Sequence, residues 1–98
     1  MSNYVFAFYG LPTRTPPEDF EARWGSWFAG LGSAIADMGN RVASVRTLPD
    51  GAESRAGLTG YIVVSAGDAD EAAKLASGCP GLDYGITVEI AEVVPSVQ

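Results

Sequence analysis

Short apolar runs, some of them interleaved with polar residues, predict four strands along the chain. They are Tyr4–Tyr9, Arg41–Leu48, Leu58–Ser65 and Ile86–Val94. The first is aromatic or β-branched on both faces, which is typical of a strand that is covered on both sides. A turn at Pro49-Asp50-Gly51 and a loop at Ala52–Gly57 link the second and third strands.

Apolar residues at steps of three and four predict a long helix between the first two strands. They are Phe20, Trp24, Trp27, Phe28, Leu31, Ile35 and Met38. Thr15, Pro16 and Glu18 form a capping box that would start this helix, and Gly39 with Asn40 would end it. Three glycines within it are interpreted as close packing on the sheet or on a partner helix: Gly25, Gly30 and Gly32.

A second, shorter helix is predicted after the third strand. Asp68 as N-cap and Glu71 three residues later form a capping box, and Gly78 followed by Pro80 ends the helix. The element order is therefore β-α-β-β-α-β, the order of the ferredoxin-like fold. Right-handed crossovers would lay both helices on one face of a four-stranded antiparallel sheet. The sequence thus predicts one α+β domain over residues 1–98.

The predicted sheet has more apolar side chains than two helices can cover. Its first, third and fourth strands are apolar on both faces, and the chain holds no third layer. A contiguous apolar face in contact with water promotes association. We therefore expect a homodimer in which two sheets pack face to face.

The composition excludes several classes of function. The chain has 98 residues, a net charge of −6, no histidine and a single cysteine, Cys79. An intrachain disulfide is impossible, a zinc site of Cys/His type lacks ligands, and no histidine can act as a base. Six scattered basic residues disfavour nucleic-acid binding. No apolar run is long enough for a membrane span and no signal peptide is evident, so a cytoplasmic location is expected.

Four residues are candidates for binding a small molecule. Tyr9 and Trp24 could line a cleft with their rings, although a tryptophan on the apolar stripe more often belongs to the core. Arg14 follows the first strand, and Arg46 lies in the second predicted strand. Either could anchor an anionic ligand, because a guanidinium group matches a carboxylate, or could point outward into solvent.

Two carboxylates are candidates for a general base. Asp37 is predicted near the end of the first helix, where it could also pair with Arg41 or Arg46 or be solvated. Glu89 in the last strand would be a buried carboxylate with a raised pKa if it faced a cavity between two sheets. At an edge of the sheet it would have no chemical role.

The remaining reactive groups indicate neither a metal nor a cofactor. Cys79 follows a helix C-terminus, where the dipole does not favour a thiolate, so a packing role is expected. Asp68, Asp70 and Glu71 form an acidic cluster, but a helix N-terminus attracts acidic residues without any metal. We expect no bound metal and no cofactor.

Short segments along the chain form an ordered set of motifs. They are Trp24–Gly32, Asp37–Asn40, Leu58–Val64, Asp68–Ala72, Ser77–Pro80, Tyr84-Gly85 and Val88–Ile90. This set resembles the YCII-related (DGPF) family of the dimeric α/β-barrel superfamily, and the similarity spans residues 4–94. The resemblance implies a ferredoxin-like protomer paired through its sheets. It also implies a cleft between the barrel side of each sheet and nearby loops.

The chain departs from this family in its chemical groups. Many members have no assigned activity, a few are small-molecule enzymes, including a dehydrochlorinase of aromatic degradation, and others are proposed to use a His-Asp pair. No histidine is present here, and the Asp-Gly-Pro-Phe motif is missing, although Asp50-Gly51 lies in the predicted turn. Small-molecule binding is therefore ranked first. The alternatives are a lyase or isomerase with Asp37 or Glu89 as base and Tyr9 as acid, and a non-catalytic interaction module.

Overall fold

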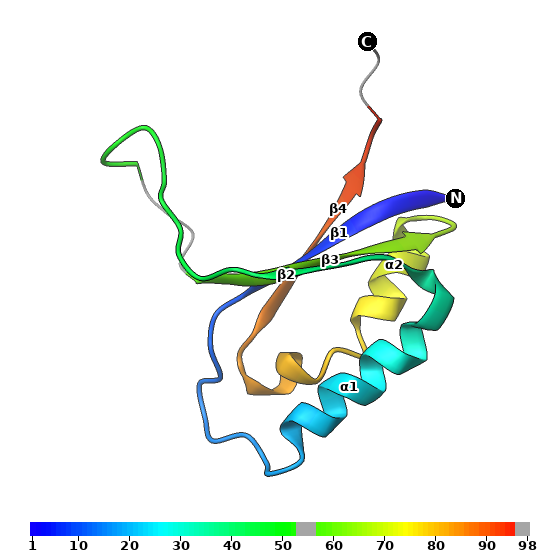
Figure 1. Ribbon diagram of the computed structural model, residues 1–98, viewed down its shortest axis with the longest axis horizontal. Coiled ribbons are helices and arrows are strands. Elements are labelled where there is room, and N and C mark those ends of the chain that lie inside the picture. Colours follow the sequence, from blue (N-terminus) through cyan, green and yellow to red (C-terminus); the bar gives the residue numbers. More distant parts are fainter. Residues whose placement is uncertain (53–56, 96–98) are drawn as a thin grey trace.

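In residues 1–52 and 57–95, which the computed structural model describes, two α-helices pack against one face of a four-stranded antiparallel sheet (Figure 1). The strands are β1 (Ser2–Tyr9), β2 (Ile35–Arg41), β3 (Leu58–Ala66) and β4 (Thr87–Val93), in spatial order β2-β3-β1-β4. The helices are α1 (Phe20–Leu31) and α2 (Ala69–Ala76), with short 3₁₀ turns at η1 (Gly32–Ala34) and η2 (Pro80–Tyr84). The predicted ferredoxin-like fold class is confirmed.

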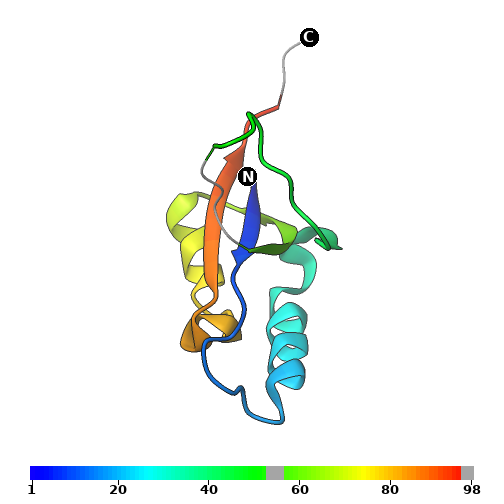
Figure 2. The same cartoon turned by 90° about the vertical axis from the view of Figure 1, so that its left-hand side faces the viewer.

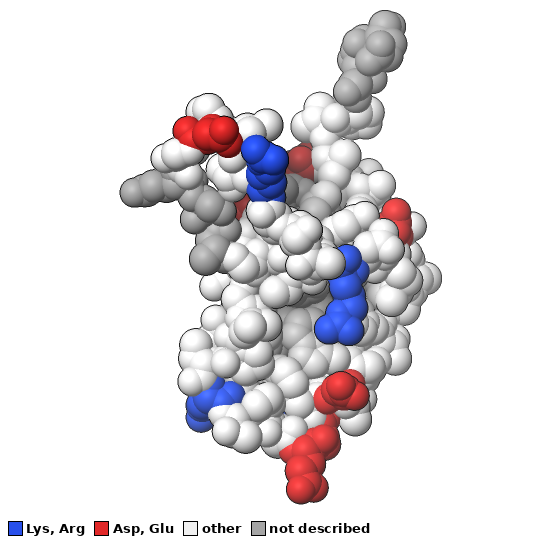
Figure 3. Space-filling model, turned by 60° about the vertical axis from the view of Figure 1, so that its left-hand side comes forward, with Lys and Arg blue, Asp and Glu red and all other residues white. Residues whose placement is uncertain are grey.

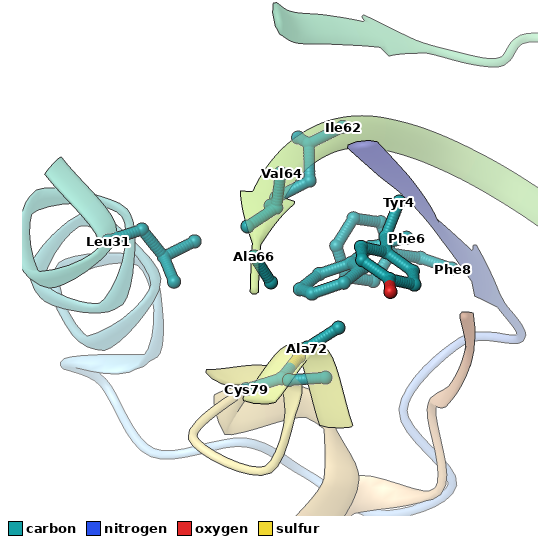
Figure 4. Close-up of a cluster of buried hydrophobic side chains, with 10 residues drawn as sticks. Tyr4, Phe6, Phe8, Leu31, Ile62, Val64, Ala66, Ala72 and Cys79 are labelled. Atoms are coloured by element: carbon teal, nitrogen blue, oxygen red, sulfur yellow. The ribbon is translucent and has the colours of Figure 1, made fainter. Parts of the chain in front are cut away.

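The core lies between the two central strands and the helices (Figure 4). Alternate residues of β1 and β3 are buried on this face, as their pleat requires: Tyr4, Phe6, Phe8, Ile62, Val64 and Ala66. The ring of Trp27 on α1 stacks on Phe6 with centroids 6.5 Å apart. Its Nε1 donates a hydrogen bond to the carbonyl oxygen of Leu75 (3.1 Å), which ties α1 to α2.

Helix α1 begins later than the expected capping box. The helix starts at Phe20, so Thr15 lies too early in the sequence to be its N-cap residue. Pro17 is the physical reason, because a residue that precedes a proline is disfavoured in the helical region, which keeps Pro16 out of a helix. Asp19 precedes the helix without a side-chain cap, and its carboxylate instead pairs with Arg23 at 3.1 Å.

The predicted continuation of α1 to Met38 is wrong. The helix ends at Leu31, and Gly32 caps it with a φ of +53° and a hydrogen bond from its N–H to the Phe28 carbonyl. Two glycines within three residues weaken a helix at this point. The chain then enters β2 at Ile35, so Asp37 lies in a strand and not at a helix end.

The strand predicted at Arg41–Leu48 is also wrong beyond its first residues. The last pairing with β3 joins Val42 N–H to the Thr59 carbonyl (2.9 Å). β3 begins at Leu58, so the residues that follow Val42 have no strand beside them, and the chain projects beyond the sheet (Figure 1). Most of the loop expected at 52–57 lies outside the described residues.

Helix α2 matches its prediction. Asp68 has extended backbone angles, and its Oδ1 accepts a hydrogen bond from the Glu71 N–H at 2.8 Å, as a capping box requires. Ala72 and Ala76 are buried, so small side chains let the helix approach the sheet closely. Neither helix in the described ranges has the length and hydrophobicity to cross a bilayer.

The other face of the sheet is uncovered by any described element. We call it the open sheet face; its apolar members on the three strands β1, β3 and β4 are Val5, Ala7, Tyr9, Tyr61, Val63, Ala91 and Val93. The structure exposes 6729 Å² of surface. A compact monomer of this mass would expose about 5,300 Å². The segment after Val42, which projects beyond the sheet, contributes to this excess (Figure 1).

Candidate functional site

A cleft of about 860 Å³ lies on the helix side of the sheet. We call it the α1 cleft: α1 forms one wall, the β1–α1 loop a second, and the adjoining ends of β2 and β3 a third. Figure 3, turned so that the β1–α1 loop comes forward, shows a hollow in a mostly uncharged surface, with a few charged side chains around it. A volume of this size suits a small organic molecule.

Aromatic rings form the inner wall of the α1 cleft. Trp24 is central: it meets Phe8 edge-on with centroids 5.5 Å apart, Phe20 at 6.1 Å and Phe28 at 5.9 Å. Phe20, Trp24 and Phe28 follow one another at steps of four along α1, which brings them to the same side of the helix, and Phe8 comes from β1. Such a wall offers flat apolar surface for stacking a ligand ring.

Two large apolar side chains remain in water at the mouth of the cleft. Leu11 of the β1–α1 loop is 74% exposed, and Met38 of β2 is 58% exposed. Each lies beside the aromatic wall, so together they extend its apolar surface outward. A contiguous exposed apolar patch of this kind marks a binding surface more often than an isolated apolar side chain does.

The charged groups of the cleft come from two different walls. Glu21 lies in the first turn of α1, and Arg41 is the last residue of β2. Both are exposed, and neither makes an ion pair with another described residue. Asn40 and Thr59 add polar atoms: Asn40 donates to the Tyr61 hydroxyl (3.2 Å), and the Thr59 hydroxyl donates to the Phe8 carbonyl (3.2 Å).

Arg14 holds the β1–α1 loop in place. Its Nη2 donates a hydrogen bond to the Asp83 carbonyl (2.7 Å), and its guanidinium lies over the Tyr84 ring, 4.7 Å from the centroid. The N–H of Thr13 also donates to the Tyr84 carbonyl (2.8 Å). Figure 2 shows the loop running past η2 before it reaches α1. Arg14 therefore positions a wall of the cleft, and its charge already has partners.

Only one of the four predicted ligand-binding residues lines the α1 cleft. Trp24 does so. Tyr9 pairs with Thr87 on the open sheet face, away from the cleft. Arg46 lies in the projecting segment, with 81% of its side chain exposed and a 3.8 Å contact to Asp50. The structure thus does not bring Tyr9, Arg14, Trp24 and Arg46 into one site within this chain.

The two candidate bases also lie outside the cleft. Asp37 is exposed on β2 opposite Val63, and its Oδ1 accepts a hydrogen bond from the Gly39 N–H at 2.7 Å. Glu89 is exposed on the edge strand β4, opposite Ala7 and therefore on the open sheet face. Within one chain they share no pocket with the aromatic wall.

Cys79 belongs to the core. It is 3% exposed and packs with Ala72 and Ala76 in the buried cluster. Burial raises the pKa of its thiol, an effect that the backbone N–H groups of Gly81 and Leu82 partly offset. A thiol that resists ionisation is a poor nucleophile.

A second, smaller hollow of about 490 Å³ lies between α1 and η2. Its lining includes three charged residues, Asp19, Arg23 and Asp83. Arg23 and Asp19 already satisfy each other, with 3.1 Å between Nε and Oδ1. This hollow therefore offers a ligand less than the α1 cleft.

Gly25 and Gly30 do not pack closely on any residue that the structure describes. A Cβ at either position would have no neighbour within 4 Å, so the close-packing interpretation is wrong for contacts within the protomer. Gly25 lines the α1 cleft, whereas Gly30 does not. Only Gly32 is explained by its conformation, at the end of α1.

We expect Gly25→Ala and Gly30→Ala each to stabilise the protein by about 0.5–1 kcal/mol, because alanine loses less backbone entropy in a helix. For a domain of this length the melting temperature should rise by about 4 °C. Thermal unfolding followed by circular dichroism measures it. A fall in melting temperature for either variant would show that this side of α1 contacts something absent from the protomer.

Sequence reasoning missed most of the cleft. The apolar spacing places Phe20, Phe28 and Met38 on the stripe of one long helix, and it offers Arg41 only as a partner for Asp37. The signal that could have separated them is the Gly30–Gly32 break, after which the residues to Arg41 form a strand. That break brings Met38 and Arg41 from β2 to face α1 across the cleft.

The fold has a counterpart among solved structures. The chain is similar to 5-chloro-2-hydroxyhydroquinone dehydrochlorinase from Burkholderia phenoliruptrix, solved in complex with 2,5-dihydroxybenzoquinone. The TM-score is 0.57, the alignment covers 98% of this chain and 96% of that chain, and 12% of residues are identical. No family model and no curated protein sequence matches the chain. The likeness shows the fold, and supports the YCII-related resemblance at that level alone.

Proposed function

We propose that this protein binds a small aromatic molecule in the α1 cleft. The observation that carries the proposal is the wall of Phe8, Trp24 and Phe28, continued at its mouth by exposed Leu11 and Met38. A ligand ring that covers this surface would remove apolar area from water. Each Å² of apolar area removed stabilises the complex by about 25 cal/mol. Rings also gain from edge-on and offset contacts with other rings.

The structural neighbour supports this class of ligand. That enzyme was solved with 2,5-dihydroxybenzoquinone, a single small ring. We propose that the present chain is a distant member of the same YCII-related group and binds a ring of similar size. Binding stays ahead of catalysis in this proposal, since Asp37 and Glu89 both lie outside the α1 cleft.

We also propose that the protein is a homodimer paired through the open sheet face. The apolar side chains of this face have no cover from any described element of the protomer, and a standard interface covers about 800 Å² on each partner. A second copy stacked on this face would cover its apolar side chains. It would also enclose Tyr9 and Glu89, which lie on that face.

Filling the α1 cleft from α1 tests the binding proposal. Gly25→Leu places a branched side chain into the cleft without a clash, because a Cβ there has open space around it. Gly30→Leu is the matched control on the same helix, with equally open space but outside the cleft. Calorimetric titration with 2,5-dihydroxybenzoquinone and benzoate should show binding to the wild type and to Gly30→Leu. Gly25→Leu should bind at least about tenfold more weakly, because the added side chain displaces the ring. A tenfold change corresponds to a loss of roughly 1.4 kcal/mol of binding free energy.

Two results would contradict the proposal. One is the absence of binding by the wild type for every small aromatic probe at millimolar concentration. The other is equal affinity of Gly25→Leu and Gly30→Leu, which would place the ligand elsewhere. Equal melting temperatures of the two leucine variants establish that both are folded.

A further inference from the structure

We infer that the ligand of the α1 cleft is an aromatic carboxylic acid, with its ring on Trp24 and its carboxylate on Arg41. The inference rests on the proposed function and names the ligand class for that same cleft. It starts from Arg41, which lines the cleft and whose guanidinium has no hydrogen-bond or ion-pair partner among the described residues.

The other described arginines differ from Arg41 in this respect. Arg14 binds the Asp83 carbonyl and covers Tyr84, Arg23 pairs with Asp19, and Arg46 contacts Asp50. In a chain with twice as many acidic as basic residues, an arginine without a carboxylate partner is notable. Its planar fork matches a carboxylate with two parallel hydrogen bonds, a geometry that a hydrated ammonium does not offer.

The strand register places Arg41 in line with the aromatic wall. Arg41 pairs with Gly60, and Gly60 pairs with Phe8, so the three positions form one row across β2, β3 and β1 on the helix side. Gly60 contributes no side chain to the middle of this row. Two strand spacings separate the ends, roughly 10 Å. That span fits one ring joined to a carboxylate by a short chain.

The charges of the cleft give the ligand a direction. Glu21 on α1 lies on a different wall from Arg41 and would repel a ligand carboxylate. The acid end therefore sits at the end of β2, and the ring end lies toward α1. The net charge of −6 works against any anion at long range, so binding should strengthen when salt screens that charge, until the contact with Arg41 is itself screened.

Matched probes separate the anionic contact from the ring contact. The probes are 3-phenylpropanoate, its uncharged amide and 3-phenylpropylamine, titrated by calorimetry into the wild type, Arg41→Gln, Arg41→Lys and Arg46→Gln. Arg41 and Arg46 are both exposed, so the glutamine variants should fold, and Arg46→Gln is the control for lost charge outside the cleft.

We expect the wild type to bind the acid about tenfold more tightly than the amide. This factor corresponds to the contribution of one charge-assisted hydrogen bond to the binding free energy. Arg41→Gln should abolish this preference while leaving the amide unchanged. Arg41→Lys should restore it only in part, because it loses the fork. Arg46→Gln should behave as the wild type.

The possible failures are distinguishable. If acid and amide bind equally and Arg41→Gln changes neither, the inferred carboxylate contact is wrong and the aromatic cleft remains. If the amine binds best, Glu21 and not Arg41 sets the ligand class, and the inference is overturned. If no probe binds any variant, the proposed function fails with it.

Discussion

Gly39→Ala should lower the free energy of unfolding by about 3–5 kcal/mol, among the largest effects of any single substitution in this chain. Gly39 has a φ of +62°, a region in which a Cβ costs about 1–2 kcal/mol. An added Cβ would also overlap the carbonyl oxygen of Tyr61 and lie 2.7 Å from its carbonyl carbon. Both neighbours are backbone atoms of β3, so relief requires β2 to move away from the sheet.

Urea unfolding followed by tryptophan fluorescence measures this effect. Gly30→Ala is the control, because its Cβ meets nothing and its helical backbone favours alanine. A change below about 1 kcal/mol for Gly39→Ala would show that β2 does not make this tight approach to β3. The N–H of Gly39 also donates to the Asp37 carboxylate (2.7 Å), so Asp37→Ala should weaken the same irregular part of β2 to a smaller extent.

The elements that sequence pattern predicted well are those whose signals are local. β1, β3 and β4 are short runs rich in aromatic and β-branched residues, and the Asp68–Glu71 capping box starts α2 where expected. Each of these patterns has one physical origin, either the pleat of a strand or the unpaired N–H groups at a helix end. The fold class follows from their order alone.

The largest errors concern β2. Ile35 and Met38 continue the spacing of the α1 stripe by coincidence, so periodicity could not distinguish a longer helix from a helix followed by a strand. Pairing with β3 decides the outcome, because the edge of the sheet offers hydrogen bonds to Ile35–Arg41 and none beyond Val42. This is a tertiary effect, and it cannot be predicted from any short segment of the sequence.

The candidate site was harder to predict than the fold for the same reason. Trp24 was found because aromatic side chains line clefts in general. Arg41 reaches the cleft only if β2 occupies its observed place, and Arg14 had partners on η2 that lie about seventy residues away in sequence. Neither contact can be read from spacing. Asp37 was placed at the end of a helix that does not extend so far.

Val63→Lys should dissociate the proposed homodimer. Val63 lies on the open sheet face in the inner strand β3, between Val5 on β1 and Asp37 on β2. In the protomer it is only half-buried, and a lysine there can reach water and the neighbouring Asp37 carboxylate, so folding should be little affected. Between two stacked sheets the same ammonium group would be desolvated.

The symmetry of a dimer increases the effect. A twofold interface presents both copies of residue 63 to the same contact, so each substitution is felt twice. The dimer dissociation constant should rise by about 100-fold or more, because the interface would bury charged groups without fully compensating them. Sedimentation velocity over a range of concentrations measures it, with Ala29→Lys on the exposed side of α1 as the control.

The Val63→Lys variant also tests whether ligand binding in the α1 cleft depends on the dimer. Val63 belongs to the open sheet face and does not line the α1 cleft, so a monomeric Val63→Lys protein should still bind the aromatic probes if the cleft is complete within one chain. If probe binding disappears together with the dimer, the partner completes the site, and Tyr9 and Glu89 return as candidates on the shared face. A wild-type protein that sediments as a monomer at tens of micromolar would instead remove the dimer, and the open sheet face would need another cover.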